Sequence, residues 1–284
     1  SWIEQPLVNR EEILRRLDAV EEFTSQHVLT MTLSEELQGV YDVERLLSKV
    51  SYKSLNARDC LSLCASLKKV PGIRNLLSGA QSQGVQAVYA LLDPLEDLTG
   101  LLERAIHPDA PPVISEGGII RDGYSAILDE YRSAATNGKQ WIVDLEAKER
   151  ETTGIKNLRI VFHKIFGYCI EVTKSFYDLV PLRYARRQTL ANCERYVTPE
   201  LQEMERKILG AADRAIRLEQ ELFAALKDYL AEGIERMQRT AEGLKTLDAL
   251  HALATVALEN NYVRPAITDD GKIDIRDGRH PVVE

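Results

Sequence analysis

Apolar residues recur every three or four positions along the N-terminal part of the chain, the spacing of one face of an α-helix. Asn9 is suited to cap a first helix, and Ile13 opens the apolar stripe that continues to Phe23. Similar patterns run through residues 33–50, 57–77 and 83–105. Pro71 predicts an interruption in the second of these, and Pro94 predicts the start of another helix in the third. We therefore predict a multi-helix core.

Two longer segments carry a heptad-like apolar seam. A helix over residues 121–150 would be about 45 Å long at its usual rise. Its seam comprises Tyr124, Ile127, Tyr131, Ala134, Gly138, Trp141 and Leu145. Pro199 opens the second segment, with Thr198 as its cap, and the stepping continues through Leu201, Met204, Ile208, Ala211, Ala215, Leu218, Leu222, Ala225 and Tyr229. Two such seams predict an antiparallel helix pair that carries the residues between them at its tip.

Those intervening residues change period. Residues 158–162 and 168–172 are rich in β-forming side chains and are separated by a turn that contains Gly167, so they predict a hairpin. Residues 186–190 and 195–197 could add one or two strands, and a sheet of three or four strands is more stable than a lone hairpin. The predicted fold class is mainly α, a multi-helix core with two long antiparallel helices carrying a small inserted antiparallel β domain.

The ends of the chain carry weaker signals. Residues 269–272 have the composition of a hairpin turn, and the alternating Ile273 and Ile275 follow. Residues 2–3 resemble the tail of a helix and residues 281–283 the start of a strand, which predicts that the chain is part of a longer protein. The aspartates of this region lack the spacing of a calcium loop.

Charge is unevenly distributed. The whole chain has a net charge of −8, which argues against general nucleic-acid binding. Residues 151–198 nevertheless hold eight basic and four acidic side chains, so this segment is at +4 and the remainder at −12. A basic module inside an acidic helical protein favours a local anionic partner. The alternative is solvated charge on a small sheet.

Signs of catalysis and of metal binding are missing from the sequence. The four cysteines form no CxxC pair, which disfavours zinc and favours small buried side chains in a reducing compartment. The chain has no phosphate-binding loop, no GxGxxG, no HExxH and no GxSxG motif. Its five histidines are scattered, so a catalytic site would have to be assembled from distant residues. No apolar run is long enough to span a bilayer, and no N-terminal signal peptide is visible.

Several stretches nevertheless resemble one family, in its order. They are WIEQPL at 2–7 with RRLDAV at 15–20, YDVERL at 41–46, DGY at 122–124, YARRQTLANCERYVTPEL at 184–201 and DGRHPVVE at 277–284. Together they cover essentially the whole chain, which resembles the middle of the MutS family of DNA mismatch-recognition proteins. The stretches at 184–201 and 277–284 are the most specific.

The resemblance implies a division of labour. Residues 1–150 would be the core and the first lever helix, 151–209 an inserted clamp domain, 210–265 the returning lever helices, and 266–284 the start of an ATPase domain. The phosphate-binding loop would lie beyond this chain, so the resemblance implies no catalysis and no cofactor here, but ATP and Mg in the full-length protein. It also implies a cytoplasmic homodimer, no membrane, mismatched or looped double-stranded DNA as partner, and downstream repair proteins such as MutL.

Contact with a DNA backbone needs Lys and Arg for charge, and Asn, Gln or similar donors for hydrogen bonds. The candidates are Lys156, Asn157, His163, Lys164, Arg186, Arg187, Gln188 and Asn192. The family often has Asn where His163 stands and Lys where Ala191 stands, so the second position has lost a charge. Alternatively, Arg186 or Arg187 pairs with Glu194 or Glu171 inside the sheet. A second hypothesis for the whole chain is a non-catalytic helical scaffold whose inserted module docks a protein partner.

Overall fold

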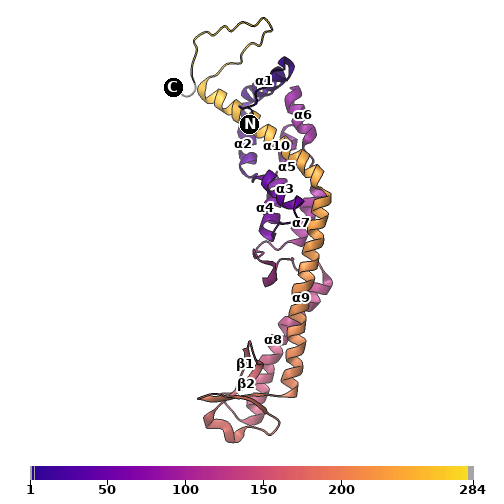
Figure 1. Cartoon of the computed structure of the whole chain (residues 1–284), viewed down its shortest axis with the longest axis vertical. Coiled ribbons are helices and arrows are strands. Elements are labelled where there is room, and N and C mark those ends of the chain that lie inside the picture. Colours follow the sequence, from indigo (N-terminus) through magenta and orange to yellow (C-terminus); the bar gives the residue numbers. More distant parts are fainter. Residues whose placement is uncertain (1, 3, 281–284) are drawn as a thin grey trace. The chain divides into compact units, whose positions relative to one another are not determined.

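The computed structural model describes residues 2 and 4–280, and these form ten α-helices, two short 3-10 helices and four strands (Figure 1). The chain divides into two compact units. The first contains residues 1–55, 62–100 and 230–284, and the second contains residues 56–61 and 101–229. Three helices continue from one unit into the other: α4 (Ala57–Leu67), α7 (Glu96–Ala105) and α9 (Pro199–Glu232).

The first unit is helical. It contains α1 (Arg10–Ser25), α2 (His27–Gln38), α3 (Val43–Ser51), α5 (Val70–Leu76), α6 (Gln83–Leu91) and α10 (Ile234–Asn260). Helix α10 packs against α1, α3 and α6, so it forms the centre of the unit. The Asn9 side chain accepts the Glu12 backbone N–H at 3.2 Å, which confirms the predicted cap of α1. Fully buried side chains of this core include Phe23, Leu33, Leu46, Ile73 and Leu247.

Helix breaks divide the predicted helical patterns further. The helical pattern at 33–50 belongs to two helices, because α2 ends before Gly39 and α3 begins after Asp42, whose carboxylate accepts the Arg45 N–H at 3.0 Å. The interruption near Pro71 is confirmed, since α4 and α5 are separate helices. Pro94 lies between α6 and α7, as predicted. The long segment after Pro199 is also divided, at Gly233.

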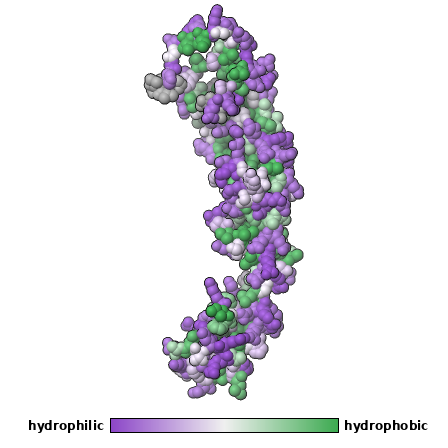
Figure 2. Space-filling model, viewed as in Figure 1, coloured by the Kyte–Doolittle hydropathy of each residue, from purple (hydrophilic) through white to green (hydrophobic). Residues whose placement is uncertain are grey.

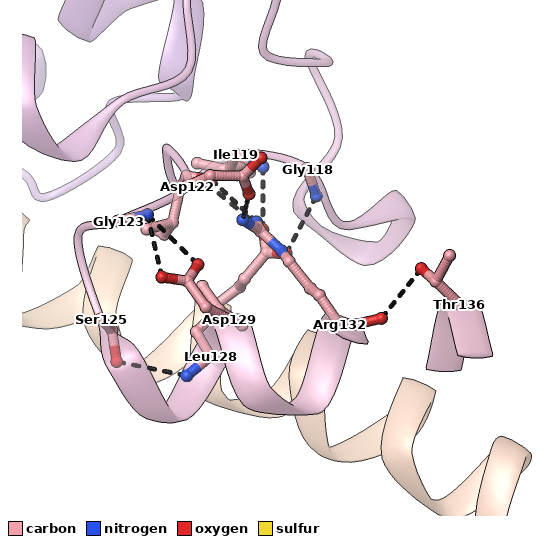
Figure 3. Close-up of polar contacts among 11 residues, drawn as sticks. Gly118, Ile119, Asp122, Gly123, Ser125, Leu128, Asp129, Arg132 and Thr136 are labelled. Atoms are coloured by element: carbon pink, nitrogen blue, oxygen red, sulfur yellow. Dashed lines mark hydrogen bonds and ion pairs between the residues drawn. The ribbon is translucent and has the colours of Figure 1, made fainter. Parts of the chain in front are cut away.

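Helices α8 (Ala126–Thr153) and α9 form the predicted antiparallel pair in the second unit. Contacts run in opposite order along the two helices: Lys148 with Glu200 at 3.3 Å, Gly138 with Ile208, Tyr131 with Arg214 at 5.2 Å, and Arg132 with Glu219 at 2.8 Å. Helix α8 has 28 residues and is therefore about 42 Å long. The 3-10 helix η1 (Ile114–Glu116) lies in the loop that precedes α8, and Figure 3 shows Arg132 of α8 beside Gly118, Ile119 and Asp122 of that loop.

The predicted seam is partly wrong. On α8, Ile127 and Trp141 are exposed, whereas the residues that follow them, Leu128 and Ile142, are buried. On α9 the prediction is confirmed from Leu201 to Ala215, after which the buried positions fall one residue later, at Glu219, Phe223 and Leu226. A straight α-helix drifts against a seven-residue repeat, and polar residues occupy part of the interface. A count of apolar residues alone misses both effects.

The insert forms one antiparallel sheet in the order β1-β2-β4-β3. Its strands are β1 (Arg159–His163), β2 (Gly167–Thr173), β3 (Ala185–Thr189) and β4 (Cys193–Val197), and the 3-10 helix η2 (Lys174–Leu179) follows β2. Gly167 has a φ of 73°, which suits the turn before β2. The Thr198 hydroxyl accepts the Leu201 N–H at 3.1 Å, which confirms the predicted cap of α9. The sheet lies where α8 ends and α9 begins (Figure 1).

One face of the sheet packs on the helix pair. A single buried cluster joins side chains of α8, α9 and the sheet: Ile142, Leu145, Ile155, Leu158, Ile170, Val172, Tyr184, Tyr196, Leu201 and Ile208. The sheet and the adjacent helix ends therefore share one core, so we expect the sheet to move with these helix ends.

The C-terminal tail contains a turn but no strand among residues 261–280. Asp270 accepts the Lys272 N–H at 3.2 Å around Gly271, while Ile273 and Ile275 are exposed. The helix tail predicted at residues 2–3 and the strand predicted at 281–283 lie outside the described residues, except for Trp2. Every described helix is too short or too polar to cross a bilayer. On the face shown in Figure 2, apolar side chains form only small separate patches.

Candidate nucleic-acid interface

The sheet presents a polar face away from the helix pair. Glu171 lies between Ile170 and Val172, which are both buried in the shared core. Side chains alternate along a strand, so Glu171 lies on the opposite, outer face. Its register partners Arg159 and Arg195 share that face, as does His163 further along β1. This outer face holds two of the predicted site residues, His163 and Gln188.

A line of polar contacts crosses all four strands on the outer face. His163 Nε2 lies 3.4 Å from Glu171 Oε1, and Arg195 Nε donates to the same oxygen at 2.7 Å. Arg195 Nη1 donates to Gln188 Oε1 at 2.7 Å. We call these four residues the outer-face relay. The Glu171 carboxylate can only accept a hydrogen bond, so in this contact the His163 proton lies on Nε2. The other ring nitrogen, Nδ1, is then an acceptor in the neutral ring and a donor only in the protonated ring.

Arg186 is paired inside the sheet, which was one of the two alternatives. Its Nη1 lies 3.3 Å from Glu194 Oε1. The Tyr196 hydroxyl also donates to Glu194, as does Thr189 at 3.2 Å. The hydrogen bond from Tyr196, followed by those from Thr189 and Arg186, holds the pKa of Glu194 below its usual range. The Arg186 side chain is still 64% exposed, so the pairing does not remove it from the surface.

Arg187 occupies the irregular position of the edge strand. The register between β3 and β4 shifts between Arg186 and Gln188, so Arg187 is the extra residue of a bulge. Its side chain is exposed and forms no ion pair with any described residue. Charged residues and bulges are also a common means of protecting a sheet edge from aggregation, so the geometry alone fits either role.

The remaining candidates lie at the two ends of the sheet. Lys156, Asn157 and Asn192 lie at the end that carries the β3–β4 turn, where Asn157 Nδ2 donates to Thr173 Oγ1 at 2.5 Å. His163 and Lys164 lie at the β1–β2 turn. Strand β2 separates these ends by about 20 Å at the usual rise. The eight candidates therefore fall into three places, the two ends and the edge strand, rather than one cluster.

Lys174 is one of the eight basic residues of segment 151–198 and is not among the eight candidates. Its backbone N–H donates to the Asn192 carbonyl oxygen at 3.4 Å, which puts it at the β3–β4 turn end. Its exposed side chain forms no ion pair with the described residues, and the same holds for Lys156 and Lys164. The only signal in the sequence was the charge of Lys174. Its place at this end of the sheet depends on the pairing of β2 with β4, which the sequence alone does not show.

Carboxylates on α8 and α9 accept hydrogen bonds from the inserted sheet and from the segment that leads into β3. Glu146 accepts the Ile160 N–H at 2.7 Å, and Glu205 accepts the Tyr168 N–H at 3.3 Å. Buried Glu149 accepts from Arg183 at 2.5 Å and from the Tyr184 hydroxyl at 2.6 Å. Burial, reinforced by the bond to Glu149, raises the pKa of Tyr184 well above its ordinary value. These bonds fix the sheet against the ends of α8 and α9.

Apolar side chains are also exposed at the β1–β2 turn, a feature that the sequence analysis did not single out. Ile165 is 86% exposed, and Phe162 is half exposed while its ring lies 5.1 Å from that of Tyr168. In the described part of the chain, no group of three or more His, Cys, Asp or Glu side chains is arranged to hold a metal ion. Fold and surface together define a mainly helical protein whose paired long helices carry a small basic antiparallel sheet.

Comparison with known proteins identifies the family. The family model described as MutS domain III matches residues 1–254. The DNA mismatch repair protein MutS of Acetivibrio thermocellus is 49% identical over 284 residues, all of this chain and 33% of that relative. Those of Clostridium botulinum (strain Langeland) and Lachnoclostridium phytofermentans are 48% and 46% identical over the same length, 30% of each relative. The chain belongs to the MutS family, and it spans about a third of the length of these curated relatives.

Proposed function

We propose that the inserted module, residues 151–209, is a clamp that grips duplex DNA by its backbone. The observation that carries this proposal is that cations at both ends and along the edges of one small sheet are exposed and form no ion pair with the described residues, among them Lys156, Lys164, Lys174 and Arg187. Phosphates attract such side chains regardless of base sequence. Family membership supports the same direction.

The proposed contacts divide by chemistry. Lys156, Lys164, Lys174, Arg186 and Arg187 would neutralise phosphates. Asn157, Gln188 and Asn192 would supply hydrogen bonds to phosphate or sugar oxygens, as would His163 with a protonated ring. Groups about 20 Å apart along β2 would follow a length of backbone rather than one phosphate. Such an interface positions a duplex but does not read its bases.

Under this proposal the rest of the chain carries the clamp and transmits motion. Residues 1–150 are the core and first lever helix, 210–265 are the returning lever helices, and 266–284 are the start of an ATPase domain outside this chain. Long helices are stiff, and the bonds from Glu146, Glu149 and Glu205 would pass a movement of the helices to the sheet. This chain would not be catalytic. The full-length protein would use ATP and Mg. It would act as a homodimer on mismatched or looped DNA and bind repair proteins such as MutL.

Fluorescence anisotropy with labelled matched and mismatched duplexes tests the proposal. The chain should bind both equally, because backbone contacts carry no base information. Binding should weaken steeply with salt, since each phosphate contact releases counterions. A preference for the mismatched duplex would contradict backbone gripping, and absence of binding even at low salt would contradict DNA contact by this chain.

Docking of a protein partner by the insert is the second candidate function. The exposed Ile165 and the half-exposed Phe162 at the β1–β2 turn favour it, because apolar side chains at a loop tip suit a protein interface better than a phosphate backbone. Salt distinguishes the two candidates, since a mostly apolar docking site would respond weakly to ionic strength. The Ile165→Ser variant should leave duplex binding unchanged if the clamp proposal is correct.

A further inference from the structure

The outer-face relay ends at the edge strand, on Gln188. An arginine guanidinium carries only hydrogen-bond donors. The Gln188 side-chain atom 2.7 Å from Arg195 Nη1 must therefore be the amide oxygen. The amide nitrogen is the other end of the same group, and its two N–H groups have no partner among the described residues. Gln188 is thus held with its acceptor inward and its donors available.

Arg195 is itself held in place. Its Nε donates to Glu171 Oε1 at 2.7 Å, and its side chain is only 15% exposed. Two of its nitrogens are used within the sheet, and its neighbours on either side are strands β2 and β3. Arg195 is therefore poorly placed to touch a ligand directly, and its contacts serve to orient Gln188.

We propose that Arg195, fixed by Glu171, is a positioning residue that presents the Gln188 amide as a hydrogen-bond donor to an oxygen of the DNA backbone. This inference rests on the proposed function. A glutamine without a partner could turn its amide oxygen toward a phosphate, and the negative phosphate oxygens would repel that oxygen. The bond from Arg195 excludes this orientation, so the Gln188 side chain loses less conformational freedom when DNA binds.

The same reasoning separates Gln188 from Asn157. Asn157 bonds to a threonine hydroxyl, which both donates and accepts, so its contact does not force one amide orientation. Only Gln188 among the predicted amides is oriented by a partner that cannot accept. Gln188 should therefore contribute more to the affinity for the DNA backbone than an uncharged side chain without a fixed orientation would.

The Gln188→Glu variant isolates the donor. A carboxylate still accepts from Arg195, so the relay and the fold remain, but the N–H groups are gone. Duplex affinity should fall by about tenfold or more, the scale of a lost hydrogen bond to a charged group. Leu182→Glu adds the same charge at a fully exposed position of the insert that is not part of the relay, and it serves as the control for charge alone.

A double-mutant cycle tests positioning by Arg195. Arg195→Met should weaken duplex binding, whereas in a Gln188→Met background, which lacks the donor and adds no charge, it should weaken binding no further. A merely structural role for Arg195 would lower affinity equally in both backgrounds, and that result would overturn the inference. Circular dichroism of each variant checks that the sheet is folded.

The two proposals fail differently in this experiment. If the wild-type chain does not bind the duplex at low salt, the DNA-gripping proposal fails, and this inference falls with it. If the wild type binds with strong salt dependence but Gln188→Glu and Leu182→Glu bind alike, backbone gripping stands and the role of Gln188 and Arg195 is refuted.

Discussion

Removal of the Glu219 carboxylate should destabilise the second unit more than any exposed substitution on the same helix. Glu219 lies on α9 with its side chain 4% exposed. It accepts the backbone N–H groups of Gly118 at 3.1 Å and Ile119 at 2.8 Å, and Arg132 Nη2 at 2.8 Å. Figure 3 shows Arg132 directed into the loop that carries Gly118 and Ile119. One carboxylate therefore joins α8, α9 and this loop.

The expected change in unfolding free energy follows from the buried groups that would lose their partner. Glu219→Ala would leave buried N–H groups without an acceptor and Arg132 without its buried partner, and breaking a buried pair costs about 3–5 kcal/mol. Glu219→Gln keeps one acceptor oxygen but turns an amide NH₂ toward other donors. We therefore expect this variant to lose about 2 kcal/mol of unfolding free energy. Glu221→Gln, an exposed change two residues away, should alter the unfolding free energy by less than about 0.5 kcal/mol.

Urea unfolding monitored by circular dichroism gives the free-energy differences. Hydrogen exchange at the Gly118 and Ile119 amides gives a local readout, and both should exchange faster in Glu219→Gln. If Glu219→Ala and Glu221→Gln unfold alike, or if the two amides remain equally protected, the buried carboxylate does not hold this loop and the reasoning is refuted.

The pH dependence has a definite sign. Burial works against ionisation of Glu219, but the hydrogen bonds from Arg132, Gly118 and Ile119 outweigh it, so the pKa lies below the usual 4.5. A depressed pKa contributes stability that is present above the unfolded value and is lost as pH falls through the folded value. The stability gap between wild type and Glu219→Gln should therefore narrow as pH falls below 4.5. A gap that is constant across this range would contradict the assignment.

Two further substitutions test other parts of the account. Gly138→Ala should destabilise the α8–α9 pair by about 1–3 kcal/mol in urea unfolding, because the added Cβ would lie 2.2 Å from Ile208 Cγ1. This loss should exceed the gain from the better helix propensity of alanine. Unchanged or increased stability would mean that the two helices are not this close. Arg186→Ala combined with Arg187→Ala should weaken duplex binding in anisotropy without unfolding the insert, whereas intact binding with a lowered melting temperature would assign both residues to structure.

Local signals in the sequence were sufficient for the inserted sheet and its junction with α9. The change of period at residue 158, the glycine turn at Gly167 and the cap at Thr198 each depend on neighbouring residues, so they could be interpreted without tertiary contacts. The helix pairing followed because both flanking segments carry apolar stripes. The shift of the buried face at Glu219 could not be predicted, because its partners Gly118 and Arg132 are distant in sequence and the residue is charged.

The candidate site was less predictable for a related reason. Composition identified the basic insert, but strand register decides which cations are paired. Register brings Glu171 opposite Arg195, and the bulge at Arg187 then sets which β3 side chains reach β4. A shift of one residue would exchange the two faces of the strand. The sequence therefore could not separate Arg186, which is paired, from Arg187, which forms no ion pair within the described part of the chain.

The most direct test of the clamp proposal is the salt dependence of duplex binding, compared between the wild-type chain and a variant with glutamine at Lys156, Lys164, Lys174 and Arg187. If each of these cations meets one phosphate, they together contribute about −3.6 to the log–log slope, at about −0.9 per contact. We predict that the variant remains folded and loses most of that slope. Equal slopes for both proteins would contradict the claim that these side chains grip the DNA backbone.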